Sequence, residues 1–157
     1  GFNAGDANTT GSDNTAIGDN ALGANTTTSQ NTAVGSGALL LNTANNNTAV
    51  GYNALDANTT GATNTAVGGY ALSANTTVDN NTAVGYGALQ ANTTGTRNTA
   101  VGASSGLVAS TGSYNTLFGW QAGVAITTSD SNVLFGSSAG AAITTGANNV
   151  AMGHSAL

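Results

Sequence analysis

Apolar and polar positions recur together along this chain in one repeated unit. The fullest form of the unit is Asn-Thr-Ala-Val-Gly-x-x-Ala-Leu-x-Ala-Asn-Thr-Thr followed by three variable residues, as in residues 64–80. Successive units are offset by seventeen positions in every case except one, where the offset is one position shorter. The units begin at Asn14, Asn31, Asn47, Asn64, Asn81, Asn98, Asn115, Asn132 and Asn149. A period this regular predicts one repeat array that spans residues 1–157.

Two short segments of each unit have the composition of β-strands, namely Thr-Ala-Val and the later Asn-Thr-Thr. Each is bounded by Gly or by the Asn, Ser and Asp residues that favour turns. No apolar pattern with helical spacing persists, and both segments are too short for a helix. Two strands and two turns per unit predict an all-β fold, a flat parallel β-solenoid of about nine coils.

Stacking the coils in register would place identical residues about 4.8 Å apart and give a rod of about 43 Å. The Asn that opens each unit would then form a column of stacked carboxamides, an arrangement that stabilises stacked strands. The Gly that follows the apolar strand residue is expected to supply a backbone conformation that a Cβ would not tolerate. The single deletion falls between Asn42 and Asn47, which predicts an exposed turn there.

The apolar interior of such a coil is small. Each unit offers about two large apolar side chains, such as Val67 and Leu72, and this is thin support for ordering a whole coil. We therefore expect chains to associate laterally, with closed symmetry. In the late units, side chains at several positions change size together: Phe118 stands in place of Val, Gly123 in place of Leu and Ile126 in place of Asn. Gains of volume at some positions are matched by a loss at another, which predicts that these positions share one core.

Composition and charge narrow the class of partner. Only 4% of the residues are charged, the net charge is -5, and the chain has 23 Gly but no Pro and no Cys. A single Arg among six acids argues against nucleic-acid binding and against a polybasic contact with membranes. No apolar run is long enough to insert into a membrane. The chain starts and stops inside a unit, so we expect it to be a segment of a longer fibre.

Four ring-bearing residues follow the repeated Gly in every second unit: Tyr52, Tyr86, Trp120 and His154. Small residues occupy the same position in the units between them: Gly69, Ala103 and Ser137. Two coils span about 9.6 Å, so the rings could interleave with the small residues along one edge. The rings either pack at a boundary between subunits or form an aromatic track that stacks on sugar rings.

No motif predicts an enzyme, a cofactor or a metal site. Residues 102–106 and 136–140 match the Gly-x-Ser-x-Gly pattern of hydrolases, but they lack the helix and the His and acid partners that such a site needs. His154 is the only His, so no His cluster can form. The six Asp residues form no repeated column, and calcium sites are therefore not indicated.

The units 31–35 and 81–89, with the core Asn-Thr-Ala-Val-Gly, resemble the head repeats of trimeric autotransporter adhesins of the YadA type and related bacteriophage tail-fibre repeats. The resemblance implies a left-handed parallel β-roll, three chains around a common axis, and binding to a host glycan or matrix protein. This chain differs from the adhesins in its longer unit and in its Thr at a position where they often have Ser.

The sequence therefore favours a non-enzymatic extracellular fibre segment, the head or shaft of an adhesin or tail fibre. One alternative is a filament subunit that stacks end to end, since the terminal coils would leave unpaired edges. A third hypothesis is ice binding by a column of threonines at positions 32, 48, 65, 82 and 99.

Overall fold

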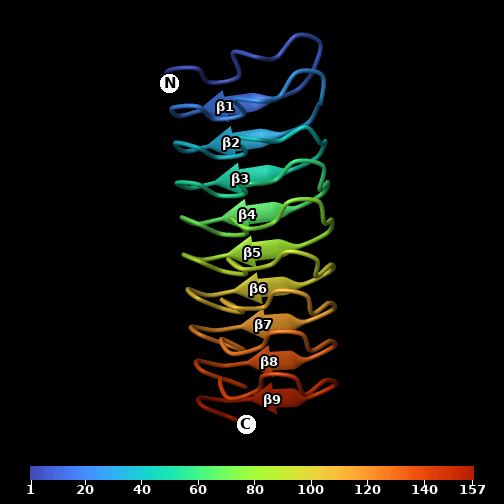
Figure 1. The fold of residues 1–157 in the computed structure, drawn as a ribbon. Helices are drawn as coiled ribbons and strands as arrows, with labels where there is room; N and C mark the ends of the chain where they lie inside the picture. The colour runs from blue at the N-terminus through green and yellow to red at the C-terminus, as the bar shows by residue number, and fades with distance from the viewer.

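The computed structural model describes residues 1–157 and contains nine three-residue β-strands and no helix. The strands are β1 (Thr15–Ile17), β2 (Thr32–Val34), β3 (Thr48–Val50), β4 (Thr65–Val67), β5 (Thr82–Val84), β6 (Thr99–Val101), β7 (Thr116–Phe118), β8 (Val133–Phe135) and β9 (Val150–Met152). They form one sheet in the order of the sequence, and Figure 1 shows them stacked from the N-terminus to the C-terminus. The predicted parallel β-solenoid is therefore confirmed. None of its elements is a helix suited to crossing a membrane.

All neighbouring strands are parallel, and like residues are paired. Thr48 pairs with Thr65, and Val50 pairs with Val67. The same register holds from β1 to β9. Eight strand-to-strand steps correspond to a rod of about 38 Å between the first strand and the last.

The shortened unit keeps this register because its deletion lies in a turn. Thr32 pairs with Thr48 although the two are one position closer in sequence than the paired residues of other units. Asn31 Nδ2 donates to the carbonyl of Ala44 at 2.9 Å, a bond that other units make to a residue one position later in the unit. The missing residue therefore falls between Thr43 and Ala44, within the segment that the sequence indicates.

The Asn-Thr-Thr segment does not form the second strand that we predicted. Asn58 Nδ2 donates to the carbonyl of Gly61 at 2.8 Å and curls the backbone into a turn. The backbone N–H groups of Thr59 and Thr60 both donate to the carbonyl of Thr76, at 2.7 and 3.2 Å, which breaks the alternation of a strand ladder. Of the 96 backbone–backbone hydrogen bonds, 80 lie outside the strands, so irregular segments hold the coils together as much as the sheet does.

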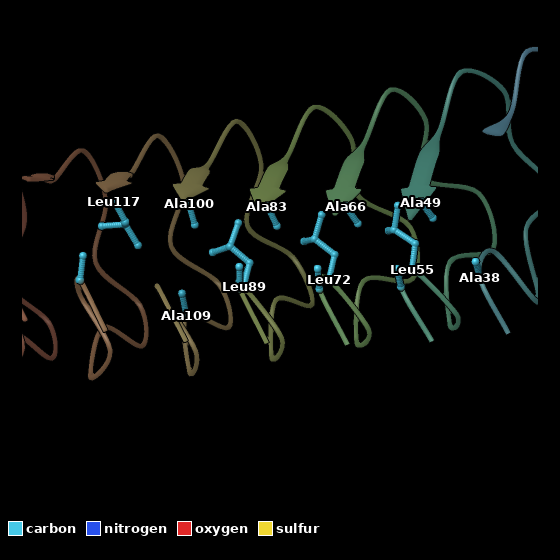
Figure 2. Close-up of a cluster of buried hydrophobic side chains, with 14 of the residues drawn as sticks. Ala38, Ala49, Leu55, Ala66, Leu72, Ala83, Leu89, Ala100, Ala109 and Leu117 are labelled. Atoms are coloured by element: carbon cyan, nitrogen blue, oxygen red, sulfur yellow. The ribbon is translucent and has the colours of Figure 1, made fainter. Parts of the chain in front are cut away.

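The interior is a narrow column of Ala and Leu side chains. Ala49 and Ala66 point inward from the centres of β3 and β4, and Leu55 and Leu72 approach them from the segment opposite (Figure 2). All four are fully buried. Val67 does not join them, contrary to expectation, because it lies half-buried on the outer face of the sheet.

The late coils fill the same space differently. Leu117 replaces Ala at the centre of β7, and Gly123 replaces the opposing Leu. A Cβ on Gly123 would lie 2.8 Å from Ile126 Cδ1 and 3.0 Å from Leu117 Cδ2, so these two side chains occupy the vacated volume. The predicted exchange is thus real, but Phe118 takes no part in it, since its side chain is 44% exposed on the outer face.

The opening Asn of each unit forms a buried ladder. Asn64 Oδ1 accepts a hydrogen bond from the backbone N–H of Asn81 at 2.9 Å, and Asn64 Nδ2 donates to the carbonyl of Val78 at 2.8 Å. Equivalent bonds to the next backbone N–H continue through every unit from Asn14 to Asn149. Each side chain therefore joins its own coil to the next, which confirms the predicted Asn column.

A second Asn ladder occupies the first half of the rod and then stops. Asn75 Nδ2 donates to Asn58 Oδ1 at 3.0 Å, and Asn92 Nδ2 donates to Asn75 Oδ1 at 3.2 Å. The next coil carries Ala109 at this position. Asn92 Oδ1 is consequently buried without a hydrogen-bond partner. This end of the ladder is a local defect, since an unpaired buried acceptor lowers stability.

Replacing Ala109 with Asn is expected to raise the free energy of unfolding by about 1 kcal/mol. The new carboxamide would donate to Asn92 Oδ1 and to the carbonyl of Gly112, which now accepts only from Asn98 among side chains. Urea denaturation followed by circular dichroism measures the change. The same replacement at Ala122, which is equally buried but outside the ladder, is expected to destabilise. A loss of stability for Ala109→Asn would show that the ladder cannot extend.

Each coil turns through residues with positive φ, and many of them are not Gly. In the fourth unit these are Gly68 at 130°, Tyr70 at 59°, Leu72 at 52° and Asn80 at 62°. The role predicted for the repeated Gly is confirmed by Gly68. The left-handed Leu and Tyr were not expected, because bulky residues rarely adopt this conformation.

Candidate functional site

The rod has no enclosed site. No pocket is present, and no group of three or more His, Cys, Asp or Glu residues is placed to hold a metal ion. The interior is filled by Ala, Leu and hydrogen-bonded Asn side chains. Two regions of the outer surface stand out by the side chains that they expose.

The serines of the hydrolase-like patterns lie in ordinary repeat turns. Ser104 and Ser138 have φ values of 56° and 57°. Their backbone N–H groups donate to the carbonyls of Tyr86 and Trp120, both at 2.8 Å, as the residue at this position does in other coils. No helix follows either serine, although a nucleophile elbow requires one. Both serines therefore occupy the same backbone position as the corresponding residues of the other coils.

The first region is the aromatic edge, which we define as Tyr52, Tyr86, Trp120 and His154. This position is held in line from one coil to the next by backbone hydrogen bonds. The carbonyl of the residue at this position accepts a hydrogen bond from the backbone N–H of the residue one position later in the next coil. The four residues therefore share one edge and recur every second coil, about 9.6 Å apart. All four side chains are exposed.

Tyr70 joins the aromatic edge from the neighbouring position. Its ring makes T-shaped contacts with Tyr52 and Tyr86, with centroid distances of 5.3 and 5.8 Å and interplanar angles of 80° in both cases. Gly69 lies beside these rings, and a Cβ there would lie 3.4 Å from the Tyr86 ring, at ordinary van der Waals distance. Sequence reasoning missed Tyr70 because it stands one residue off the period, although the doubled Gly68-Gly69 marks the unit as different.

The Tyr70 environment also includes the carboxyl group of Asp56. Burial raises the pKa of Asp56, against backbone hydrogen bonds that lower it, and its Oδ1 atom is buried without a partner. Desolvation likewise raises the pKa of the Tyr70 hydroxyl, with further contributions from Tyr52, Tyr86 and Asp56. Each of these two shifts favours the neutral form of its group.

The second region is the sheet face, which we define as the outward side chains of β1 to β9. One column consists of threonines and ends in two valines, and the other contains Ile, Val, Phe and Met. Neither column contains a charged residue. Phe118 and Phe135 stack with parallel rings 4.8 Å apart, and Ile17 and Met152 are exposed at the two ends. The predicted threonine column thus lies on this face, beside an apolar column.

No family model, curated protein or solved structure matches the chain.

Proposed function

We propose that the protein is a non-enzymatic segment of an extracellular fibre, in which three copies of the rod pack around a common axis and present a rigid surface for attachment. The observation that supports this most is the sheet face, an uncharged and largely apolar strip that follows all nine strands. The three-chain stoichiometry and a left-handed coil, both implied by the adhesin resemblance, belong to the proposal.

The sheet face is suited to contact with a second copy of the same chain. Continuous apolar strips of this kind are rarely left in water by monomeric proteins. In-register columns also repeat at the same interval on every copy, so two such faces can interdigitate along their whole length. The flanking valines of the central strands are already half-buried, and Phe118 and Phe135 add large apolar rings near one end.

Attachment would follow from rigidity and repetition rather than from one deep site. The rod has no pocket, and its ladders fix each coil to the next. Three copies would display every surface feature three times, and several weak contacts made together give a higher avidity than one contact alone. The ligand would be a glycan or a matrix protein on the surface of a host.

The mass of the protein in solution tests the assembly. Light scattering at micromolar concentration is expected to give three times the 15.0 kDa mass of one chain. Val67→Asp is expected to give the monomer, because it places a charge in the centre of the sheet face. Thr77→Asp, on an exposed turn of the same unit, is the matched control and should leave the mass unchanged.

A monomeric mass for the unaltered chain would contradict the proposal. Electron microscopy separates the remaining alternative, because short rods of uniform length are expected here and long polymers would indicate a filament that stacks end to end. Circular dichroism of Val67→Asp should keep the spectrum of the parent protein, so that dissociation is not confused with unfolding.

A further inference from the structure

We propose that the aromatic edge is a binding platform for an extended, neutral polysaccharide of β-1,4-linked sugars. This inference deepens the proposed attachment function and rests on it. It assigns Tyr52, Tyr86 and Trp120 as stacking residues and Tyr70 as a residue that positions two of the rings.

The spacing of the rings is the first argument. Tyr52, Tyr86 and Trp120 lie on one edge at successive intervals of two coils, which is about 9.6 Å per interval. An extended β-1,4-linked chain presents the same face of its sugar every second residue, and one disaccharide has nearly this length. Each ring can therefore meet an equivalent sugar face, and the match continues along the rod because both partners are linear repeats.

Exposure and rigidity are the second argument. The side chains of Tyr52, Tyr86 and Trp120 are 53%, 61% and 54% exposed, so more than half of each remains open to a ligand. Tyr70 makes T-shaped contacts with both tyrosines, and these contacts restrict the rotation of their rings. Rings that are fixed before binding lose little conformational entropy when a sugar stacks on them.

Charge indicates that the polysaccharide is neutral. Arg97 is the only Lys or Arg of the chain, and its Nη1 donates to the Tyr114 hydroxyl at 2.9 Å while its guanidinium lies over the Tyr114 ring at 5.4 Å. An acidic glycan would meet a chain of net charge -5 and an edge that contains no Lys or Arg. The absence of a pocket favours a chain that lies along the surface over a single sugar held by its end.

Trp120 is the only Trp and therefore reports binding directly by its fluorescence. The oligomeric protein is titrated with β-1,4-linked glucose oligomers and β-1,4-linked N-acetylglucosamine oligomers of two to six sugars. We expect affinity to rise steeply with length, because a hexamer reaches three rings and a dimer reaches one. Tyr86→Ala is expected to weaken binding of the hexamer by about two- to tenfold, the range for loss of one aromatic contact. Tyr114→Asn, at another exposed tyrosine off the edge, should leave it unchanged.

Three results would overturn the assignment. The first is no binding of either oligomer series by the parent protein. The second is equal binding by Tyr86→Ala and the parent protein. The third is a reduced mass for Tyr86→Ala in light scattering, which would mean that the rings pack between chains. The mass of the parent protein, measured without sugar, tests the fibre assembly separately, so failure of the glycan site and failure of the proposed function give different results.

Discussion

Gly68→Ala is expected to destabilise the protein by about 4 kcal/mol, whereas Gly69→Ala, at the next residue, is expected to change stability by less than about 1 kcal/mol. A Cβ on Gly68 would lie 2.5 Å from the carbonyl oxygen and 2.6 Å from the carbonyl carbon of Gly85 in the next coil. Gly68 also has a φ of 130°, which side-chain-bearing residues rarely adopt. Strain and collision therefore act together at this position.

Gly69→Ala is the matched control for Gly68→Ala, because the same substitution is made at the next residue and only the local geometry differs. Its φ is not in the positive range, and a Cβ there would meet Tyr86 Cδ2 at 3.4 Å and Cε2 at 3.6 Å, which is ordinary van der Waals contact. Thermal and urea denaturation of both variants measure the difference. Similar stabilities for the two variants would mean that the backbones of adjacent coils do not approach each other as closely as the structure has them.

Asn64→Leu is expected to lower the free energy of unfolding by about 3 kcal/mol, although Leu has a similar shape and is more apolar. The substitution leaves the backbone N–H of Asn81 without its acceptor and removes one of two donors to the carbonyl of Val78. Asn64 is fully buried, so water cannot replace these bonds. Urea denaturation measures the loss.

Asn80→Gly is the control for the ladder variant. Asn80 is exposed, its Oδ1 accepts from the Thr63 hydroxyl at 2.8 Å, and its φ of 62° suits Gly. We expect a change within about 0.5 kcal/mol, as for most surface substitutions. If Asn64→Leu were equally mild, the Asn column would be a consequence of stacking and not a cause of its stability.

The stacked architecture could be predicted because one strong pattern determines it. A constant period brings like residues together only if each unit is one coil, and the pairing of Thr48 with Thr65 follows. The shortened unit supported the same conclusion, since its deletion had to fall in a turn. The repeated Gly likewise indicated a special backbone conformation, which Gly68 adopts.

The local errors arose where side chains compete with the backbone. The residue types of Asn58 to Thr60 are compatible with a strand, but the Asn58 carboxamide donates to the Gly61 carbonyl and turns the chain. The core exchange was assigned to Phe118 because it is large, yet alternation along a three-residue strand puts Leu117 inside and Phe118 outside. A one-residue shift decides which side chain is buried.

The candidate surfaces were predictable in part. The spacing of Tyr52, Tyr86 and Trp120 is visible in the sequence and placed them on one edge. The contact of Tyr70 with two of these rings depends on the positive φ of Tyr70, which only the structure provides. The extent of the sheet face also required the structure, because the apolar strand residues had been expected inside.

The central claim is that successive units lie directly above one another, and distances between spin labels on one column test it most directly. Cysteine substitutions for labelling are unambiguous because the chain has no Cys. Label pairs at Ile17 and Val84, Ile17 and Phe118, and Ile17 and Met152 are separated by four, six and eight strand steps. Labelled chains are diluted with unlabelled chains so that only distances within one chain are recorded. The account predicts narrow distributions near 19, 29 and 38 Å, at about 4.8 Å per step. Distances that fail to increase in proportion to the number of units would contradict it.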